Sequence, residues 1–169
     1  MAATYTLIAS NTLGSDTASV TFSSIAGTYT DLVLRMSIRQ TGAATQGNVF
    51  IKVNNSSSSD YGTTDLRGSG SAASSTRDTS NTYIAYTANY DTSTSNTFSS
   101  VELYIPNYAG STNKVFSLFA VQETNATAAY MSAEAAIRTS TAAITEINLT
   151  GNSDYKSGSS FFLYGIKNS

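Results

Sequence analysis

The chain of 169 residues contains no cysteine, no histidine and no tryptophan, and it has a single proline. Without cysteine there is no disulfide framework, no thiolate nucleophile and no cysteine-ligated zinc site. Without histidine there is no Ser-His-Asp triad, no Cys-His dyad and no imidazole general base. We therefore expect a protein that is not an enzyme and that needs no metal and no cofactor.

Charged residues are also scarce. They make up 12% of the chain, against about 25% in a typical soluble domain. The net charge is -2, and lysine and arginine are scattered, so no basic stripe is available to bind phosphates. No apolar run approaches the ~18 residues of a membrane span, and the N-terminal segment lacks the features of a signal peptide. We expect a chain made in a cytoplasm, with neither nucleic acid nor membrane as a partner.

Alternation of apolar and polar residues is the main structural signal. In segment 32–39 every second residue is apolar, as is typical of a strand with one buried face. Segments 49–54 and 101–105 alternate in the same way. The expected core is shared by these and other strands: Leu32, Leu34, Ile51, Val53, Leu103, Ile105, Leu118, Ile147 and Leu149. Further strands are expected at 4–10, 18–25, 82–88, 114–123, 129–139, 144–150 and 160–167.

No segment carries a helical apolar stripe of three turns, although the alanines of 131–137 favour a helix locally. We predict an all-β fold, an antiparallel two-sheet sandwich of jelly-roll-like form with about ten strands. An immunoglobulin-type sandwich ranks second because its strand-C tryptophan is absent. Residues 1–169 are expected to form one domain with a long polar loop around 54–80. A flexible linker is the alternative for that stretch, but Tyr61 and Leu66 offer anchors within it.

The single proline stands in the stretch YIPNYAGSTNK, residues 104–114. Proline has no N–H to donate to a sheet, so Pro106 is expected to end the preceding strand. The residues that follow predict a polar hairpin loop with two exposed tyrosines, and loops and tyrosines are often used in protein contacts. An ordinary turn is the alternative. The candidate contact residues are Tyr104, Pro106, Asn107, Tyr108, Ser111, Thr112, Asn113 and Lys114.

Carboxylates are the remaining candidates for catalysis, since a pair of them held about 5 to 9.5 Å apart can hydrolyse a glycoside. Asp60 and Asp65 are the nearest acidic cluster in a sequence of eleven acids. No aromatic-rich segment surrounds them, so we interpret them as solvated loop acids.

Several stretches together resemble one protein family. They are TYTLIASNTLGS, FSSIAGTYTDLVLRMSIR, DLRGSGSAASSTR, VELYIPNYAGSTNK and GSSFFLYGIKNS, and they cover nearly the whole chain. The family comprises small structural proteins of tailed bacteriophages, including phages of aquatic bacteria and cyanobacteria. LYIPNYAGS and the terminal F-x-LYGIK are the most specific parts of the resemblance.

The resemblance implies a virion component that forms a homotrimer and contacts the phage major capsid protein or other virion proteins. Two roles are open. A capsid decoration (cement) protein would strengthen the shell, whereas the receptor-binding head of a tail fibre would recognise a host glycan or protein. No heptad repeat or short repeat of a fibre shaft occurs in the chain, which favours decoration.

Overall fold

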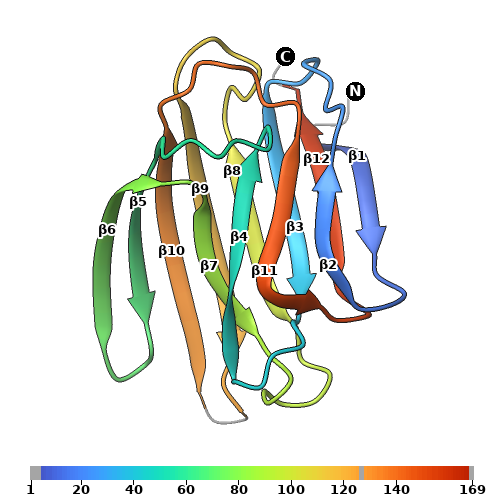
Figure 1. Ribbon diagram of the computed structural model, residues 1–169, viewed down its shortest axis with the longest axis vertical. Helices are drawn as coiled ribbons and strands as arrows, with labels where there is room; N and C mark the ends of the chain where they lie inside the picture. The colour runs from blue at the N-terminus through green and yellow to red at the C-terminus, as the bar shows by residue number, and fades with distance from the viewer. Residues whose placement is uncertain (1–4, 126–127, 168–169) are drawn as a thin grey trace.

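The computed structural model describes residues 5–125 and 128–167, which form two antiparallel sheets and contain no helix (Figure 1). The large sheet has the strand order β1-β12-β3-β8-β9-β10-β5-β6, and the small sheet has the order β2-β11-β4-β7. The strands are β1 (Tyr5–Thr12), β2 (Thr17–Phe22), β3 (Asp31–Ile38), β4 (Gln46–Val53), β5 (Tyr61–Gly68), β6 (Ala73–Asn81), β7 (Ile84–Asn89), β8 (Ser99–Ile105), β9 (Lys114–Glu123), β10 (Ala129–Arg138), β11 (Ile147–Tyr155) and β12 (Ser160–Ile166).

The predicted all-β sandwich is confirmed, and each of the ten expected strands is present. The first begins at Tyr5, and Thr4, with which the prediction began, lies outside the described residues. Segment 129–139 is the strand β10, so pairing on both sides outweighs the helical preference of its alanines. The described part of the chain contains no helix long and apolar enough to cross a membrane.

The core lies between the two sheets and has the expected composition. All nine predicted core residues are buried, with at most 2% of their surface exposed. Alternate residues of β3, β4, β8 and β11 point into this layer because successive side chains of a strand face opposite sides of the sheet. The alternation of apolar and polar residues in the sequence therefore predicted the residues of this core correctly.

The expected polar loop around 54–80 is present only as far as Asp60, because the rest of that stretch forms the hairpin of β5 and β6. Tyr61 anchors it: its ring is fully buried, and its hydroxyl accepts a hydrogen bond of 3.0 Å from the Val53 N–H. Leu66, the other expected anchor, is exposed. In β6 every residue but Asn81 is exposed, so this strand buries no apolar face and gives no periodic signal. Gly70, with φ +85°, supplies the left-handed turn.

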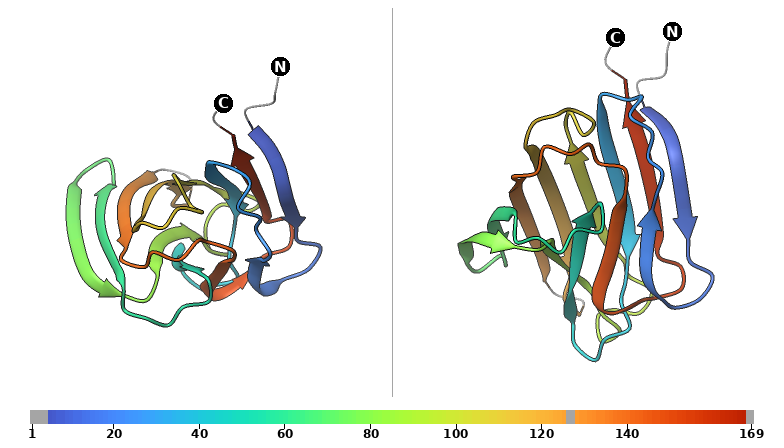
Figure 2. Two further views of the ribbon diagram at one scale, coloured as in Figure 1. Left: turned by 90° about the horizontal axis from the view of Figure 1, so that it is seen from above. Right: turned by 45° about the horizontal axis from the view of Figure 1, so that its top comes forward.

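The large sheet is wider than the small sheet. β7 forms one edge of the small sheet and packs against β9, so that β10, β5 and β6 continue beyond it. Figure 2 shows the β5–β6 hairpin standing apart from the small sheet when the molecule is seen from above. The inner side of this overhang is therefore not covered by the small sheet, and its outer side is continuous with the back of the sandwich.

Candidate functional site

The predicted contact loop lies between β8 and β9, and Pro106 directly follows the last residue of β8 as expected. Two of its predicted contact residues are buried. Tyr108 is fully buried in the core, and Lys114 is 1% exposed. Tyr104 and Pro106 are half-buried, and only Asn107, Ser111, Thr112 and Asn113 are exposed. The expectation of two exposed tyrosines is wrong.

Tyr108 and Lys114 hold the loop in place. The Tyr108 hydroxyl donates a hydrogen bond to the Ala26 carbonyl, and the Ile144 N–H donates to the Tyr108 carbonyl at 2.9 Å. The Lys114 ammonium donates to the carbonyls of Gly110, at 2.7 Å, and Thr112. Burial, with the charge of Arg138 as a smaller cause, lowers the pKa of Lys114. Sequence reasoning assigned these polar groups to a partner, whereas they stabilise the turn itself.

Tyr104 and Asn107 are tied to one aspartate on β3. The Tyr104 hydroxyl donates to Asp31 Oδ2 at 2.8 Å, and the Asn107 N–H donates to Asp31 Oδ1 at 2.9 Å. The hydrogen bond to Asp31, followed by burial, raises the pKa of Tyr104. Asn107 adopts a left-handed φ of 47°, and a Cβ on Gly110 would approach its side chain to 2.5 Å. This part of the loop is a rigid turn.

A surface that the sequence analysis missed covers the outer side of the large sheet. We call it the outer-face patch: Leu66, Val115, Phe119, Met131 and Ile137, each of which is 40–54% exposed. Val115 lies directly opposite Ile137 in the pairing of β9 with β10. Phe119 and Leu66 lie on either side of Ala133 in one row across three strands. The patch therefore runs along one face of β9, β10 and β5, with Ser117 and Thr64 between its two rows.

The sequence did contain a signal for this patch. In KVFSLFAVQE, residues 114–123, apolar side chains stand at both parities of the strand. Phe116 and Leu118 face the core and are buried, and Val115 and Phe119 face outward. Apolar residues on both faces indicate a strand that is covered on both sides, and in the single chain only the inner side is covered.

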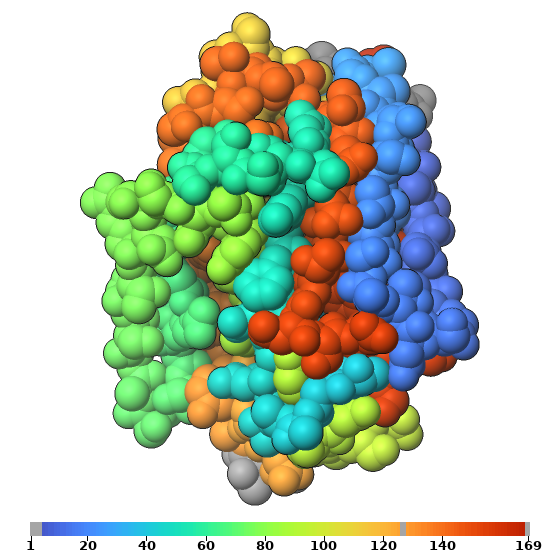
Figure 3. Space-filling view, viewed as in Figure 1, coloured from blue at the N-terminus to red at the C-terminus, as the bar shows by residue number. Residues whose placement is uncertain are grey.

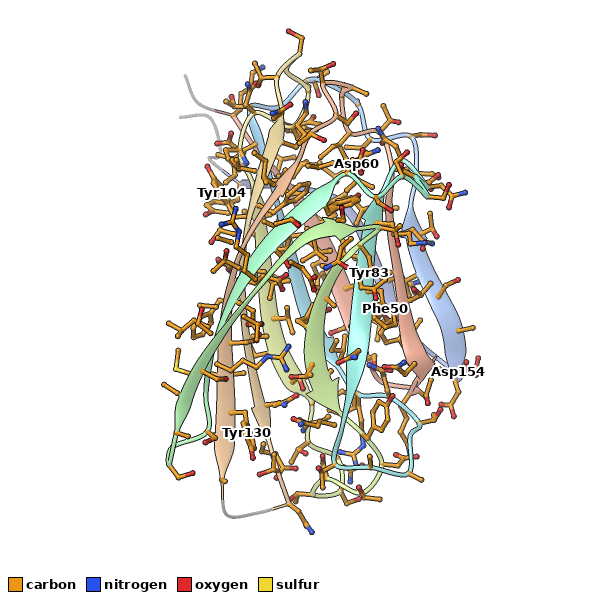
Figure 4. All side chains as sticks on the ribbon, turned by 60° about the vertical axis from the view of Figure 1, so that its left-hand side comes forward. Phe50, Asp60, Tyr83, Tyr104, Tyr130 and Asp154 are labelled. Carbon is orange, nitrogen blue, oxygen red and sulfur yellow. The ribbon has the colours of Figure 1, made fainter. Side chains whose placement is uncertain are left out.

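The predicted acidic cluster is divided by the fold. Asp60 precedes β5 and pairs with the buried Arg138, whose Nε donates to its Oδ2 at 3.0 Å. Asp65 lies within β5, directly opposite Glu134 of β10, and accepts a hydrogen bond from Arg67 Nε. Figure 4 places Asp60 near one end of the sandwich and Tyr130, in the same strand as Glu134, near the other. The structural partner of Asp65 is thus Glu134 rather than Asp60.

Glu134 is the most perturbed carboxyl of this cluster. It is 5% exposed, and among the described residues its Oε2 has no hydrogen-bond partner. Burial first, and the neighbouring charge of Asp65 second, raise the pKa of Glu134 to about 8, whereas Arg67 acts in the opposite direction. At neutral pH this side chain is therefore a neutral acid beside the ion pair of Asp65 with Arg67.

A polar cleft lies just beyond this cluster, between the β5–β6 hairpin and the edge of the small sheet. We call it the hairpin cleft. Its volume is about 190 Å³ and β9 and β10 contribute to its wall; its polar lining comes from Gln46, Arg67, Ser69, Ser74, Thr87, Gln122, Tyr130 and Ser132. Figure 3 shows the hollow between the hairpin and the small sheet. Most of its polar groups are hydroxyls and amides, and Ala72, Ala120 and Met131 supply apolar surface.

The pair of Asp65 and Glu134 is not arranged for hydrolysis of a glycoside. The acid and base of a glycosidase are usually two carboxyls, which must stand on either side of the bond that is cleaved. Asp65 and Glu134 are both buried, and neither lines the hairpin cleft. Within residues 5–125 and 128–167, no group of three acidic side chains is placed to hold a metal ion.

Comparisons with known proteins give no family for this chain. No family model matches it, and no curated protein matches it. Among solved structures it is similar to the galectin LEC-6 of Caenorhabditis elegans, at 12% identity and TM-score 0.35, over 98% of this chain and 96% of that one. A Scytalido-glutamic peptidase bound to a peptide-based transition-state analogue matches at 8% identity and TM-score 0.28, over 91% and 66% of the respective chains. Likenesses this weak carry no inference about activity.

Proposed function

We propose that this chain is a non-enzymatic structural protein of a tailed-bacteriophage virion, a capsid decoration protein that strengthens the shell as a homotrimer. The family resemblance of the sequence supports the virion assignment. The observation that carries the assembly role is the outer-face patch, because a monomeric protein rarely leaves so many large apolar side chains together on one sheet face.

The occupant of the outer-face patch is a second copy of the chain. The five side chains that define the patch are uncharged and add no like-charge repulsion where two copies meet, and Arg77 of β6 is a charge at its edge. On the same face the nearby charges Arg35 and Glu102 are paired with each other at 2.8 Å. The chain as a whole carries a net charge of only -2, which adds little repulsion between subunits. A ring of three forms when the patch of each copy contacts a different surface of the next copy, whereas a patch that pairs with itself gives a twofold dimer.

The major capsid protein is the second partner in this proposal. The exposed tip residues of the β8–β9 loop, Ser111 to Asn113, are available for it because the turn beneath them is already rigid. Pre-ordered loops lose little conformational freedom when they dock. Tyr108 does not take part, because it is buried in the chain's own core.

Sedimentation analysis of the purified chain at micromolar concentration tests the proposed assembly. We expect the mass of a trimer for the wild type and of a monomer for Phe119→Lys, because the lysine places a charge inside each subunit contact. Leu7→Lys is the matched control, since Leu7 is 51% exposed at the far end of the same sheet. A monomeric wild type, or a Phe119→Lys protein that remains trimeric, contradicts the proposal.

The receptor-binding head of a tail fibre is the second candidate, and the hairpin cleft is the feature that favours it. The cleft is recessed, as binding sites for small ligands usually are, and its hydroxyl and amide groups suit a ligand with many hydroxyls. In that role the partner would be a host-surface glycan. The number of copies in each particle distinguishes the two roles, since a shell holds far more copies than a tail.

A further inference from the structure

Gln122 places an unused acceptor at the hairpin cleft. Its side chain is 5% exposed, and its Nε2 donates a hydrogen bond to Gln46 Oε1. Its Oε1 has no hydrogen-bond partner among the described residues, although this residue lines the cleft. A buried amide oxygen without a partner destabilises the fold because it has lost its hydrogen bonds to water. A ligand hydroxyl that donates to this oxygen removes that destabilisation.

Arg67 supplies donors on the neighbouring wall. Its Nε is engaged by Asp65, and its two terminal nitrogens have no partner within the described part of the chain. Ser132 lies directly opposite Arg67 in β10, and Ser74 lies directly opposite it in β6. All three line the cleft. The cleft thus offers both donors and acceptors within one row of three strands, which suits a ligand rich in hydroxyl groups.

The charge around the cleft selects an uncharged ligand. Asp65 and Arg67 neutralise each other, and Glu134 is a neutral acid at pH 7 because its pKa is about 8. The three groups together carry no net charge, so an anionic ligand gains no attraction from Arg67 alone. The ring of Tyr130 and the methyls of Ala72 and Ala120 add apolar surface for the C–H faces of a sugar ring.

The size of the cleft limits the ligand to one ring. Its volume of about 190 Å³ is smaller than the roughly 300 Å³ at which pockets for drug-sized molecules begin. From the unsatisfied Gln122, the free nitrogens of Arg67, the absence of net charge and this volume, we propose that the hairpin cleft binds one uncharged pyranose unit of a glycan. Arg67, Gln122, Tyr130 and Ser132 line the cleft from the inner side of the large sheet, and Met131 is the one cleft residue that also belongs to the outer-face patch.

Titration of the ¹⁵N-labelled full chain with free monosaccharides tests the site. The probes are glucose, galactose, mannose and N-acetylglucosamine, with glucuronate as the charged comparison. Ser74→Tyr fills the cleft from β6, and Ser75→Tyr places the same side chain on the other face of the same strand, beside Leu66. Both positions are exposed, and tyrosine is favoured in strands, so both variants are expected to fold.

We expect at least one neutral sugar to shift the amide resonances of Gln122, Tyr130 and Ser132. Ser74→Tyr should weaken the binding of that sugar at least tenfold, which corresponds to about 1.4 kcal/mol. Ser75→Tyr should leave the affinity within about twofold of the wild type. Gln122→Ala should also weaken the binding of that sugar. The proposal is overturned if no neutral sugar shifts these resonances, if glucuronate binds more tightly than glucose, or if the two tyrosine variants weaken binding equally.

Discussion

Replacing Glu134 by glutamine should change how the stability of the protein depends on pH. The pKa of Glu134 is about 8 in the folded chain, against an ordinary value of 4.5. The folded state therefore holds a proton that the unfolded state has already lost between these two values. The stabilisation from the protonated form is complete below pH 4.5 and is lost as the pH rises through 8. Glutamine keeps the shape and never ionises.

The expected change in the free energy of unfolding follows from the shift in the pKa of Glu134. The difference between about 8 and 4.5, at about 1.4 kcal/mol per unit, gives a loss of up to roughly 5 kcal/mol in the wild type between pH 4.5 and pH 9. Asp65 and Arg67 are the charged groups that act on Glu134, and both remain in the variant. The Glu134→Gln protein should therefore lack this loss and be the more stable of the two above pH 8.

Urea unfolding followed by circular dichroism at pH 5, 7 and 9 measures the difference. Glu102→Gln is the matched control: Glu102 stands in the same sheet, and its exposed pair with Arg35 is expected to contribute less than about 1 kcal/mol. Parallel stability curves for the wild type and Glu134→Gln between pH 5 and 9 would refute the reasoning, because they would mean that Glu134 ionises normally in the folded protein.

Four further substitutions test the fold by the same unfolding measurement. Tyr108→Ala should cost about 3–5 kcal/mol, since the ring lies in the core; a cost under 1 kcal/mol would mean that the loop is not held by it. Lys114→Met should cost about 1–3 kcal/mol because the carbonyls of Gly110 and Thr112 lose their donor, and an unchanged midpoint would contradict this. Leu34→Ala and Leu103→Ala, which remove facing core residues of β3 and β8, should each cost about 2–5 kcal/mol.

The strands with a face in the core could be predicted from the sequence. Strand β6, which has no buried face, could not be predicted. β3 and β8 alternate because one face of each is buried, and burial is what places apolar residues at every second position. β6 has no buried face, so its Ser, Thr, Arg and Asp residues resemble those of a loop. Its strand conformation comes from pairing with β5 in a hairpin, and this pairing leaves no alternation of apolar and polar residues in the sequence.

The candidate site was harder to predict for a related reason. Contacts with a partner were predicted at Tyr108 and Lys114 because polar and aromatic residues in a loop usually face solvent. Both are instead directed inward, where backbone carbonyls from other segments satisfy them. The outer-face patch and the pairing of Asp65 with Glu134 depend on strand register, which brings together residues nearly 70 positions apart.

The ratio of this chain to the major capsid protein in purified virions tests the central proposal most directly. Quantitative mass spectrometry of particles from an infected culture gives that ratio without any variant. The account predicts this chain in a number comparable to that of the shell subunits and in multiples of three. A few copies per particle, the number set by a tail, would contradict the decoration role, and absence from the particle would contradict the virion assignment itself.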